Sequence, residues 1–432
     1  MAKLIEPKVL KGFRDFLPEQ EIERRELMAE LEETYKSFGF VPIDTPVLEY
    51  TEVLLGKGGG ETDKQVYHFE DHGKRDVAMR FDLTVPFARY MAAHRHELYL
   101  PFKRYHINKV WRGENTQKGR YREFVQCDFD IVGVDSASSD FEILLMMRAS
   151  MQNLGVKKCT VHFSHRGIFN RFLENLGIMD KSVEILRTVD KLAKIGRDEV
   201  IRLLTELADG DKAEKIVSFI EMKDSFEATL ANMSELAGGA EADTERLEQI
   251  WAAIKDMGLE DNFVLNPSIT RGLDYYTGLV YETFLDDLPS IGSVCSGGRY
   301  NNLAGLYTKE ELPGVGASVG LDRLLAALDE LGQSSRKKSY TEVLIFQMDD
   351  SLMGHYHKMA GIIREAGISC EVYPVNKKLG AQFKFAEAKE IPFGIICGSD
   401  EKAAGTVNLK NLASRENHEG ISLEKAIEVL KA

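Results

Sequence analysis

A long stretch of helical pattern interrupts a strand-rich chain, and this feature constrains the fold more than any other. Residues 172–258 are rich in Leu, Glu, Lys and Ala and are typical of almost continuous helix, with a break at AGGAEAD. Residues 1–170 alternate helical and strand patterns, and residues 262–332 return to strands with many glycines before the helical stretch LDRLLAALDELG. We therefore expect a helical block inserted into one β-rich domain.

The remainder of the chain predicts a linker and a separate domain. The polar stretch GQSSRKKSY, residues 332–340, is typical of a linker. Strand and helix patterns alternate in residues 341–432, which indicates a small α/β domain. The expected segments are the first part of a core (1–170), a helical insertion (171–260), the second part of the core (261–332), a linker (333–340) and a C-terminal domain (341–432).

The charge of the chain is negative but unevenly distributed. The formal net charge is −14, whereas a nucleic-acid partner needs Lys and Arg for its phosphates. Residues 172–260 hold 20 acidic and 11 basic residues, a net charge of −9, which a solvated helical face explains. Residues 333–432 hold 14 basic and 13 acidic residues, a net charge of +1. The overall sign therefore excludes no local basic surface.

Several classes of protein are disfavoured by composition. No apolar run approaches the ~18 residues that span a bilayer, and the N-terminal stretch MAKLIEPKVLKGFRDF is too charged for a secretory signal. The five cysteines are far apart and form no CxxC pair, which argues against a zinc site and a disulfide framework. The pairs His94/His96 and His355/His357 lack a third ligand at suitable spacing. A reducing cytoplasm is the simplest expected location.

Residues 102–134 predict a β-hairpin with two different faces. FKRYHINKVWRGE leads through the turn-like NTQKG into GRYREFVQCDFDIVGV. With period two, one face of the second strand is apolar: Val125, Cys127, Phe129 and Ile131. The other face carries Phe124, Gln126, Asp128 and Asp130. This second face either meets solvent or forms an exposed floor that could bind a nucleotide and a cationic amine. The second alternative is favoured by the basic residues near the turn, namely Arg112, Lys118, Arg120 and Arg122.

The stretch GVGASVGLDRL, residues 314–324, allows two interpretations. Its GxGxxxG spacing is one residue longer than the dinucleotide fingerprint, so a nicotinamide site is an alternative, although no buried strand pattern precedes it. Arg323 falls in the first turn of the expected helix, where the helix dipole disfavours a cation by about 0.3–1 kcal/mol. It therefore either pairs with an acid or completes an anion site.

Three shorter stretches add candidate ligand contacts. Asp82 and Thr84 lie two residues apart, hence on one face if the chain is extended there. The Ser-Gly-Gly run of CSGGRYNNL, residues 295–303, would let the backbone approach a ligand. Tyr275 and Tyr276 are adjacent, and a regular strand would place only one of them in a core.

Together these motifs resemble the class II aminoacyl-tRNA synthetases, and among them the histidyl-tRNA synthetase family, over essentially the whole chain. The three motifs of the class resemble FGFVPIDTPVLEY (38–50), WRGENTQKGRYREF (111–124) and GVGASVGLDRL (314–324). The two signature peptides of the histidine family resemble RGLDYYTGLVYE (271–282) and CSGGRYNNL (295–303). KGFRDFLP (11–18) and VNLKNL (407–412) also fit, whereas Asn301 stands where the family often has Asp.

The resemblance implies an α+β fold and a two-step reaction. The fold would be an antiparallel catalytic sheet flanked by helices, with a helical insertion, a C-terminal α/β anticodon-binding domain, and a homodimer formed through motif 1 with its Pro46. The reaction would be ATP-dependent formation of histidyl-adenylate from L-histidine, then transfer to the 3′ end of histidine tRNA. Mg²⁺ is expected without assigned ligands. The alternative is a catalytically inactive regulatory paralogue, although Arg112, Arg271, Arg323 and residues 341–432 are all present.

The resemblance also implies a role for each ATP-binding and tRNA-binding residue. Arg112 would bind the α-phosphate and the substrate carboxylate, Arg323 the γ-phosphate, and Arg271 would act as a further catalytic cation at the α-phosphate. Phe124 would stack on adenine, with Glu114 near its amino edge. The matching positions for the extra 5′ guanosine of the tRNA are Gln117 and Arg120.

The histidine pocket that the resemblance implies explains the paired tyrosines. Its residues are Asp82, Leu83, Thr84, Arg112, Gln126, Asp130, Arg271, Tyr275 and Tyr276. Asp82, Thr84 and Gln126 would accept from the ammonium group, and Asp130 with the two tyrosine hydroxyls would bind the imidazole. Because both tyrosines then face one pocket, we expect residues 272–276 to bend and the regular strand to start near Thr277.

Overall fold

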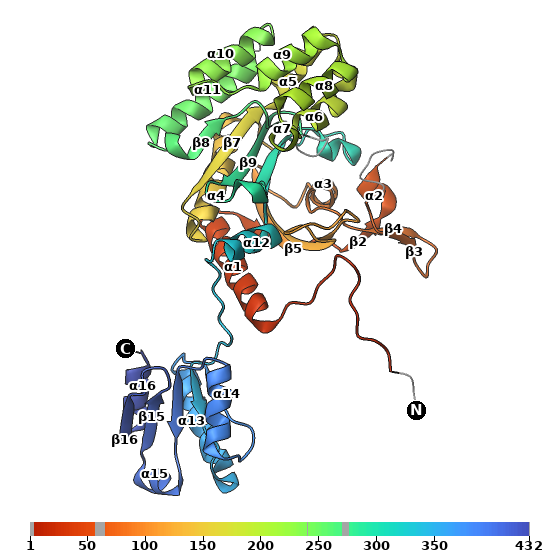
Figure 1. Cartoon of the computed structure of the whole chain (residues 1–432). Helices are drawn as coiled ribbons and strands as arrows, with labels where there is room; N and C mark the ends of the chain where they lie inside the picture. Colours follow the sequence, from red (N-terminus) through yellow and green to blue (C-terminus); the bar gives the residue numbers. More distant parts are fainter. Residues whose placement is uncertain (1–3, 57–64, 240, 270–275, 432) are drawn as a thin grey trace. The chain divides into compact units, whose positions relative to one another are not determined.

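The chain folds into two compact units. The computed structural model describes residues 4–56, 65–239, 241–269 and 276–431 (Figure 1). The large unit comprises residues 1–15 and 26–334, and the small unit comprises residues 16–25 and 335–432. The boundaries of the five expected segments stay predictions within this division.

The large unit is built around an eight-stranded sheet with the order β1-β5-β6-β11-β10-β9-β7-β8 (Figure 1). Neighbours from β5 to β7 are antiparallel, and parallel pairs occur at both edges, β1 with β5 and β7 with β8. The strands are Val41–Pro42 (β1), Phe102–Trp111 (β5), Glu123–Val132 (β6), Cys159–His165 (β7), Phe263–Leu265 (β8), Leu279–Leu285 (β9), Cys295–Tyr300 (β10) and Gly314–Gly320 (β11). The expected antiparallel sheet and α+β class are confirmed.

The predicted hairpin is confirmed as β5 and β6. The two strands pair from Trp111 with Glu123 to Phe102 with Val132. The apolar face of β6 contributes to the main core, which also takes Leu31 and Tyr35 of α1 and Leu324 of α12. Three helices therefore cover this face of the sheet, namely α1 (Pro18–Ser37), α4 (Ala137–Asn153) and α12 (Leu321–Glu330).

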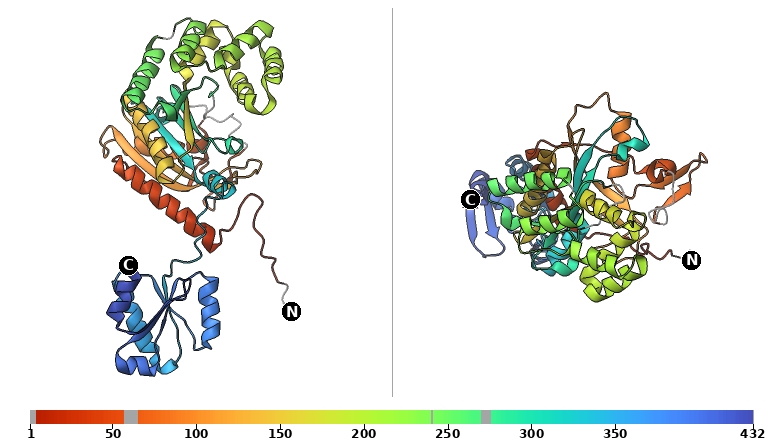
Figure 2. Two further views of the ribbon diagram at one scale, coloured as in Figure 1. Left: turned by 60° about the vertical axis from the view of Figure 1, so that its left-hand side comes forward. Right: turned by 90° about the horizontal axis from the view of Figure 1, so that it is seen from above.

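The helical stretch forms short helices gathered at one end of the large unit (Figure 2). Side-chain caps begin two of them, because Asp209 accepts a hydrogen bond from Lys212 N and Ser225 accepts one from Ala228 N. The helices are Arg166–Asn175 (α5), Ser182–Val189 (α6), Leu192–Ile195 (α7), Arg197–Leu207 (α8), Gly210–Ile220 (α9), Phe226–Leu236 (α10) and Glu241–Asp256 (α11). They follow β7 and precede β8, its neighbour in the sheet, so the block is an insertion as expected.

A smaller three-stranded sheet lies in the large unit with the order β2-β4-β3. Its strands and the two helices that accompany it are Leu48–Tyr50 (β2), His68–Glu70 (β3), Asp76–Met79 (β4), Thr51–Leu55 (α2) and Thr84–Ala93 (α3). Short 3₁₀ helices occupy Met179–Lys181, Glu260–Asn262, Pro289–Ile291, Leu303–Leu306 and, in the small unit, Asp350–Leu352.

The small unit is the expected α/β domain. Its five-stranded sheet has the order β13-β12-β14-β15-β16, with β12 parallel to both of its neighbours. Residues 333–339, before it, have no regular secondary structure. Its elements are Val343–Ile345 (β12), Cys370–Val372 (β13), Phe393–Ile396 (β14), Val407–Asn411 (β15), Asn417–Ile421 (β16), Met353–Glu365 (α13), Leu379–Ala388 (α14), Ser399–Ala404 (α15) and Leu423–Lys431 (α16).

Two properties of the whole chain complete the description. Among the helices of the described ranges, none combines the length and the hydropathy that a membrane crossing requires. All five cysteines are buried and have free thiols: Cys127, Cys159, Cys295, Cys370 and Cys397.

Candidate active site

A cleft of about 1440 Å³ opens over the second face of β6, beside β9, β10 and β11 of the large unit. It brings together most of the residues singled out in the sequence, namely Thr84, Arg112, Glu114, Gln117, Arg120, Phe124, Gln126, Asp130, Tyr276 and Arg323. Asp82 and Leu83 do not line it, since both side chains are fully buried. Arg271 and Tyr275 lie outside the described residues.

The glycines of residues 314–320 make room for the cleft rather than forming a phosphate loop. They belong to β11, a central strand that pairs with β6 on one side and β10 on the other. A Cβ atom on Gly316 would lie 2.0 Å from Asp130 Oδ1, and one on Gly297 would lie 2.1 Å from the Gly316 carbonyl oxygen. The nicotinamide interpretation was therefore wrong about this stretch, since a loop is required there.

Two buried carboxylates lie at the inner end of the cleft, where Asp130 lines it and Asp128 does not. Asp128 and Asp130 are 2% and 3% exposed, so the expectation of an open floor is wrong at this end. Arg104 lies beneath them, with its Nη2 2.7 Å from Asp130 Oδ2 and 3.9 Å from Asp128 Oδ2. Its guanidinium carbon is 4.1 Å from the centroid of the Phe87 ring. A buried carboxylate needs such a partner, because desolvation penalises its charged form.

Burial changes the proton affinity of this pair. Desolvation raises the pKa of Asp128 to about 7, and the Coulomb attraction of Arg104 opposes the rise. Repulsion from Asp130 and Asp82 adds to it. Desolvation also raises the pKa of Asp130, against the effects of Arg104 and of a hydrogen bond from Tyr300. The inner end is thus short of positive charge.

Tyr300 is a cleft residue that the sequence analysis did not single out. Its hydroxyl donates to Asp130 Oδ1 over 2.6 Å, so both oxygens of Asp130 are engaged by protein groups. The period-two pattern of CSGGRY, which places Ser296, Gly298 and Tyr300 on one face, was a signal that could have identified it.

The chain is not extended around Asp82 and Thr84, so the condition for placing the two side chains on one face is not met. Thr84 is the first residue of α3, and Asp82 Oδ1 accepts a hydrogen bond from Val85 N in the first turn over 3.1 Å. A short acidic side chain before a helix commonly satisfies such an unpaired N–H group. Thr84 therefore faces the cleft, 3.5 Å from Asp128 through its hydroxyl, while Asp82 lies behind it.

The outer part of the cleft carries arginines and an aromatic ring. Arg112 Nε donates to the Phe81 carbonyl over 2.8 Å, and its guanidinium carbon lies 5.2 Å from the centroid of the Phe124 ring. The loop between β5 and β6 folds back on itself, where Gln117 and Arg120 exchange backbone hydrogen bonds of 2.9 and 3.2 Å. These contacts close the turn at the tip of the loop, and Gln117 and Arg120 both line the cleft.

Arg323 reaches the cleft from the first turn of α12, as predicted. Its Nη1 donates to the Ser293 carbonyl over 2.5 Å. The preceding Asp322 is buried, accepts from Val125 N over 2.8 Å and pairs with Arg14. The start of α12 is therefore tied to β6, which places Arg323 relative to Phe124.

Tyr276 lies just before β9, whereas the rest of the predicted bend, residues 272–275, lies outside the described residues. Its ring covers Gly298, where an added Cβ would be 2.9 Å from the ring. Thr277 N donates to the Arg299 carbonyl over 2.8 Å, and β9 begins at Leu279. The regular strand thus starts two residues later than predicted.

The fold and the cleft agree with the class II aminoacyl-tRNA synthetases that the motifs resemble. A family model described as "Histidyl-tRNA synthetase" matches residues 12–324, and one described as "Anticodon binding domain" matches residues 342–432. The chain belongs to the histidyl-tRNA synthetase family.

Relatives and solved structures agree over the full length. A protein of Treponema denticola named "Histidine--tRNA ligase" is 53% identical, and the match covers 100% of this chain and 99% of the relative. A protein of Rhodopirellula baltica with the same name is 49% identical over 96% of each chain. The crystal structure of histidyl-tRNA synthetase from Nostoc sp. PCC 7120 has a TM-score of 0.88 and 32% identity, covering 99% of each chain.

Proposed function

We propose that this chain activates L-histidine with ATP to form histidyl-adenylate and pyrophosphate, and then transfers the histidyl group to the 3′ end of histidine tRNA. The observation that carries the proposal is one cleft that combines an anionic inner end with a cationic, aromatic outer part. Full-length relatives named histidine--tRNA ligase support it. Arg112 and Arg323 both line the cleft, which argues against the regulatory paralogue.

The first step needs positioned charge more than proton transfer. The histidine carboxylate is already ionised, attacks the α-phosphorus of ATP, and the bond to the β-phosphate oxygen breaks. Arg112 stabilises the charge at the α-phosphate and Arg323 binds the γ-phosphate. Arg271 is proposed as a third cation from the family resemblance. Mg²⁺ would arrive on the ATP phosphates, where it commonly binds; within the described ranges no group of three His, Cys, Asp or Glu side chains could hold a metal.

Adenine would stack on Phe124 with Glu114 near its amino edge. A base stacked on an aromatic ring gains about 1–3 kcal/mol. The guanidinium of Arg112 lies beside the same ring, so nucleotide base and α-phosphate would be bound by adjacent groups.

The inner end would bind histidine. Gln126 Oε1 is buried and has no hydrogen-bond partner among the described residues, so it is an available acceptor for the ammonium group. Thr84 adds a hydroxyl, and Asp82 adds negative charge from behind it, beside Leu83. For the imidazole, we propose Asp130, Tyr275 and Tyr276. Because Asp130 is engaged by Arg104 and Tyr300, it would act on the ring partly through the Tyr300 hydroxyl.

The partners follow from the same proposal. Gln117 and Arg120 would contact the 5′ end of the tRNA from the loop tip, and the small unit would bind the anticodon. A homodimer is supported by exposed apolar side chains on the edge strand β1, on β2 and the residue before it, and on β3, namely Val41, Val47, Leu48, Tyr50 and Phe69. A cytoplasmic location is part of the proposal.

The decisive experiment is ATP–pyrophosphate exchange with each amino acid in turn. We expect exchange that depends on histidine and on no other amino acid. Exchange with a different amino acid, or none with histidine, would contradict the proposal.

A further inference from the structure

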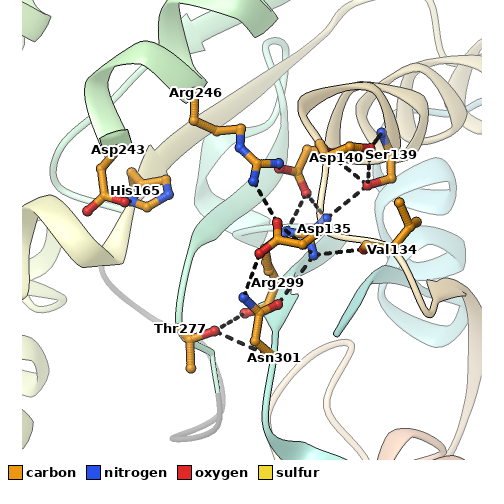
Figure 3. Close-up of polar contacts among 11 residues, drawn as sticks. Val134, Asp135, Ser139, Asp140, His165, Asp243, Arg246, Thr277, Arg299 and Asn301 are labelled. Atoms are coloured by element: carbon orange, nitrogen blue, oxygen red, sulfur yellow. Dashed lines mark hydrogen bonds and ion pairs between the residues drawn. The ribbon is translucent and has the colours of Figure 1, made fainter. Parts of the chain in front are cut away.

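Two arginines and two aspartates form a network of ion pairs in the large unit (Figure 3). Arg246 comes from α11 of the helical insertion, and Arg299 comes from β10. Between them lie Asp140 of α4 and Asp135, which precedes that helix. The four formal charges of these residues cancel, and each buried charge has an opposite charge beside it.

Each carboxylate bridges the two arginines. Asp140 Oδ2 accepts from Arg246 over 3.0 Å, while its Oδ1 lies 2.6 Å from Arg299 Nη2. Asp135 Oδ1 lies 2.6 Å from Arg246 and 3.4 Å from Arg299. Arg299 is 3% exposed and Asp140 1%, so removing a partner would leave a buried charge uncompensated.

Asn301 joins the network to the residues beside the cleft. Its amide donates to Asp135 Oδ2 over 3.1 Å, and its carbonyl oxygen accepts from Arg299 over 3.3 Å. Its backbone N–H donates to the Thr277 hydroxyl over 3.2 Å. An amide serves here because it can donate to a carboxylate and accept from a guanidinium at once. An aspartate at 301 would instead face Asp135 with like charge.

Arg299 connects the network to the residues that follow Tyr276. Arg299 accepts the backbone hydrogen bond of Thr277, and its side chain lies against Gly278, where an added Cβ would be 3.1 Å from Arg299 Cδ. The Tyr276 ring packs against Gly298, the residue before Arg299. The position of this cleft-lining ring therefore depends on the same backbone that Arg299 holds.

We propose that Arg246 is a positioning residue for the histidine pocket, through which the helical insertion fixes the segment that carries Tyr276. The inference rests on the proposed function for its kinetic consequence. The ion-pair partners of Arg246 among the described residues, Asp135 and Asp140, do not line the cleft, so Arg246 acts through them and Arg299.

The first test compares R246Q with R202Q. Arg202 is an exposed arginine of the same insertion that pairs with Glu199 and Glu206, so it is a matched control for charge. In ATP–pyrophosphate exchange we expect R246Q to raise the KM for histidine about 2- to 30-fold, with the KM for ATP and the value for R202Q unchanged. R246K should recover only part of the loss, because one ammonium cannot replace two guanidinium contacts.

A histidine KM that stays at the wild-type value in R246Q, or that rises equally with the KM for ATP, would overturn the inference. Hydrogen exchange gives a readout that does not require catalysis. Backbone amides of residues 276–301 should exchange faster in R246Q than in R202Q, and equal rates would also overturn it. Absence of histidine-dependent exchange in the wild type would instead contradict the proposed function alone.

A second pair of variants, in which the carboxylate and the amide at positions 135 and 301 are exchanged, keeps the proposal testable if R246Q fails to fold. N301D places a second carboxylate beside Asp135 and should raise the KM for histidine in the same way. The double variant N301D/D135N restores a donor–acceptor pair and should bring the KM back toward the wild-type value. Additive effects of the two substitutions would count against the proposal.

Discussion

At the scale of single residues, Gly316 matters through the side chain that it lacks. Asp130 occupies the space where a Cβ atom would be, at 2.0 Å. We expect G316A to displace the carboxylate from Tyr300 and to raise the KM for histidine about tenfold, since overpacking commonly costs about 1–3 kcal/mol. Steady-state exchange kinetics measure this. G210A is the control, since nothing lies within 4 Å of a Cβ at Gly210; an equal effect of both variants would contradict the steric argument.

His106 predicts how acid weakens the large unit. Burial, with Arg104 and Arg80 nearby, lowers the pKa of His106 to about 3, whereas the unfolded chain binds the proton near pH 6.5. Its contribution to stability is thus present above pH 6.5 and is lost as the pH falls toward 3. Between pH 7 and 5 the wild type should lose about 2 kcal/mol more than H106Q.

Denaturant unfolding at both pH values tests this expectation. H357Q serves as the control for loss of an imidazole, because His357 is exposed. Parallel loss of stability in the wild type and H106Q would show that His106 does not carry the effect.

At the scale of elements, α12 is positioned by one carboxylate. Asp322 binds Val125 N and Arg14, so the asparagine variant D322N keeps an acceptor but loses the charge that faces the arginine. We expect a loss of about 1–3 kcal/mol in unfolding free energy and a raised KM for ATP, since Arg323 follows directly. D329N, on the exposed end of the same helix, is the control. If the KM for ATP were unchanged in D322N, the position of Arg323 would not depend on the contacts of Asp322.

Elements with a regular hydrophobic period were predictable, because that period can be recognised from residues that are close in the sequence. The alternation in β6 indicated a buried apolar face and the stretch LDRLLAALDELG indicated a helix, and both were confirmed. Two local patterns misled. Glycines of β11 suggested a loop, but pairing with strands on both sides overrides their weak strand propensity. Asp82 caps α3, a role that depends on where the next helix begins.

At the scale of the whole molecule, the site depends on pairs that are remote in sequence. Tyr300 and Asp130 are 170 residues apart, and Arg299 and Asp140 are 159 apart, so no local window brings them together. Only the family resemblance led from the sequence to a common pocket. Arg104 was not singled out, since an arginine within a strand pattern gives no sign of being buried.

The two units also have separate cores. The main core of the large unit includes Cys127, Cys159 and Cys295, while that of the small unit includes Cys370 and Cys397. Burial raises the pKa of the thiols of Cys159, Cys295, Cys370 and Cys397, to about 11 for Cys159 and Cys370. These four cysteines therefore hold little reactive thiolate at neutral pH.

The buried thiols make the chain its own reporter of unfolding. A colorimetric disulfide reagent should stay colourless with the native protein and then release dye in portions of two and three equivalents as denaturant opens each unit. If two equivalents are released first, the small unit is the less stable one, and if three are released first, the large unit is. No attached label is needed. A single release of all five equivalents at one denaturant concentration would mean that the two cores melt together.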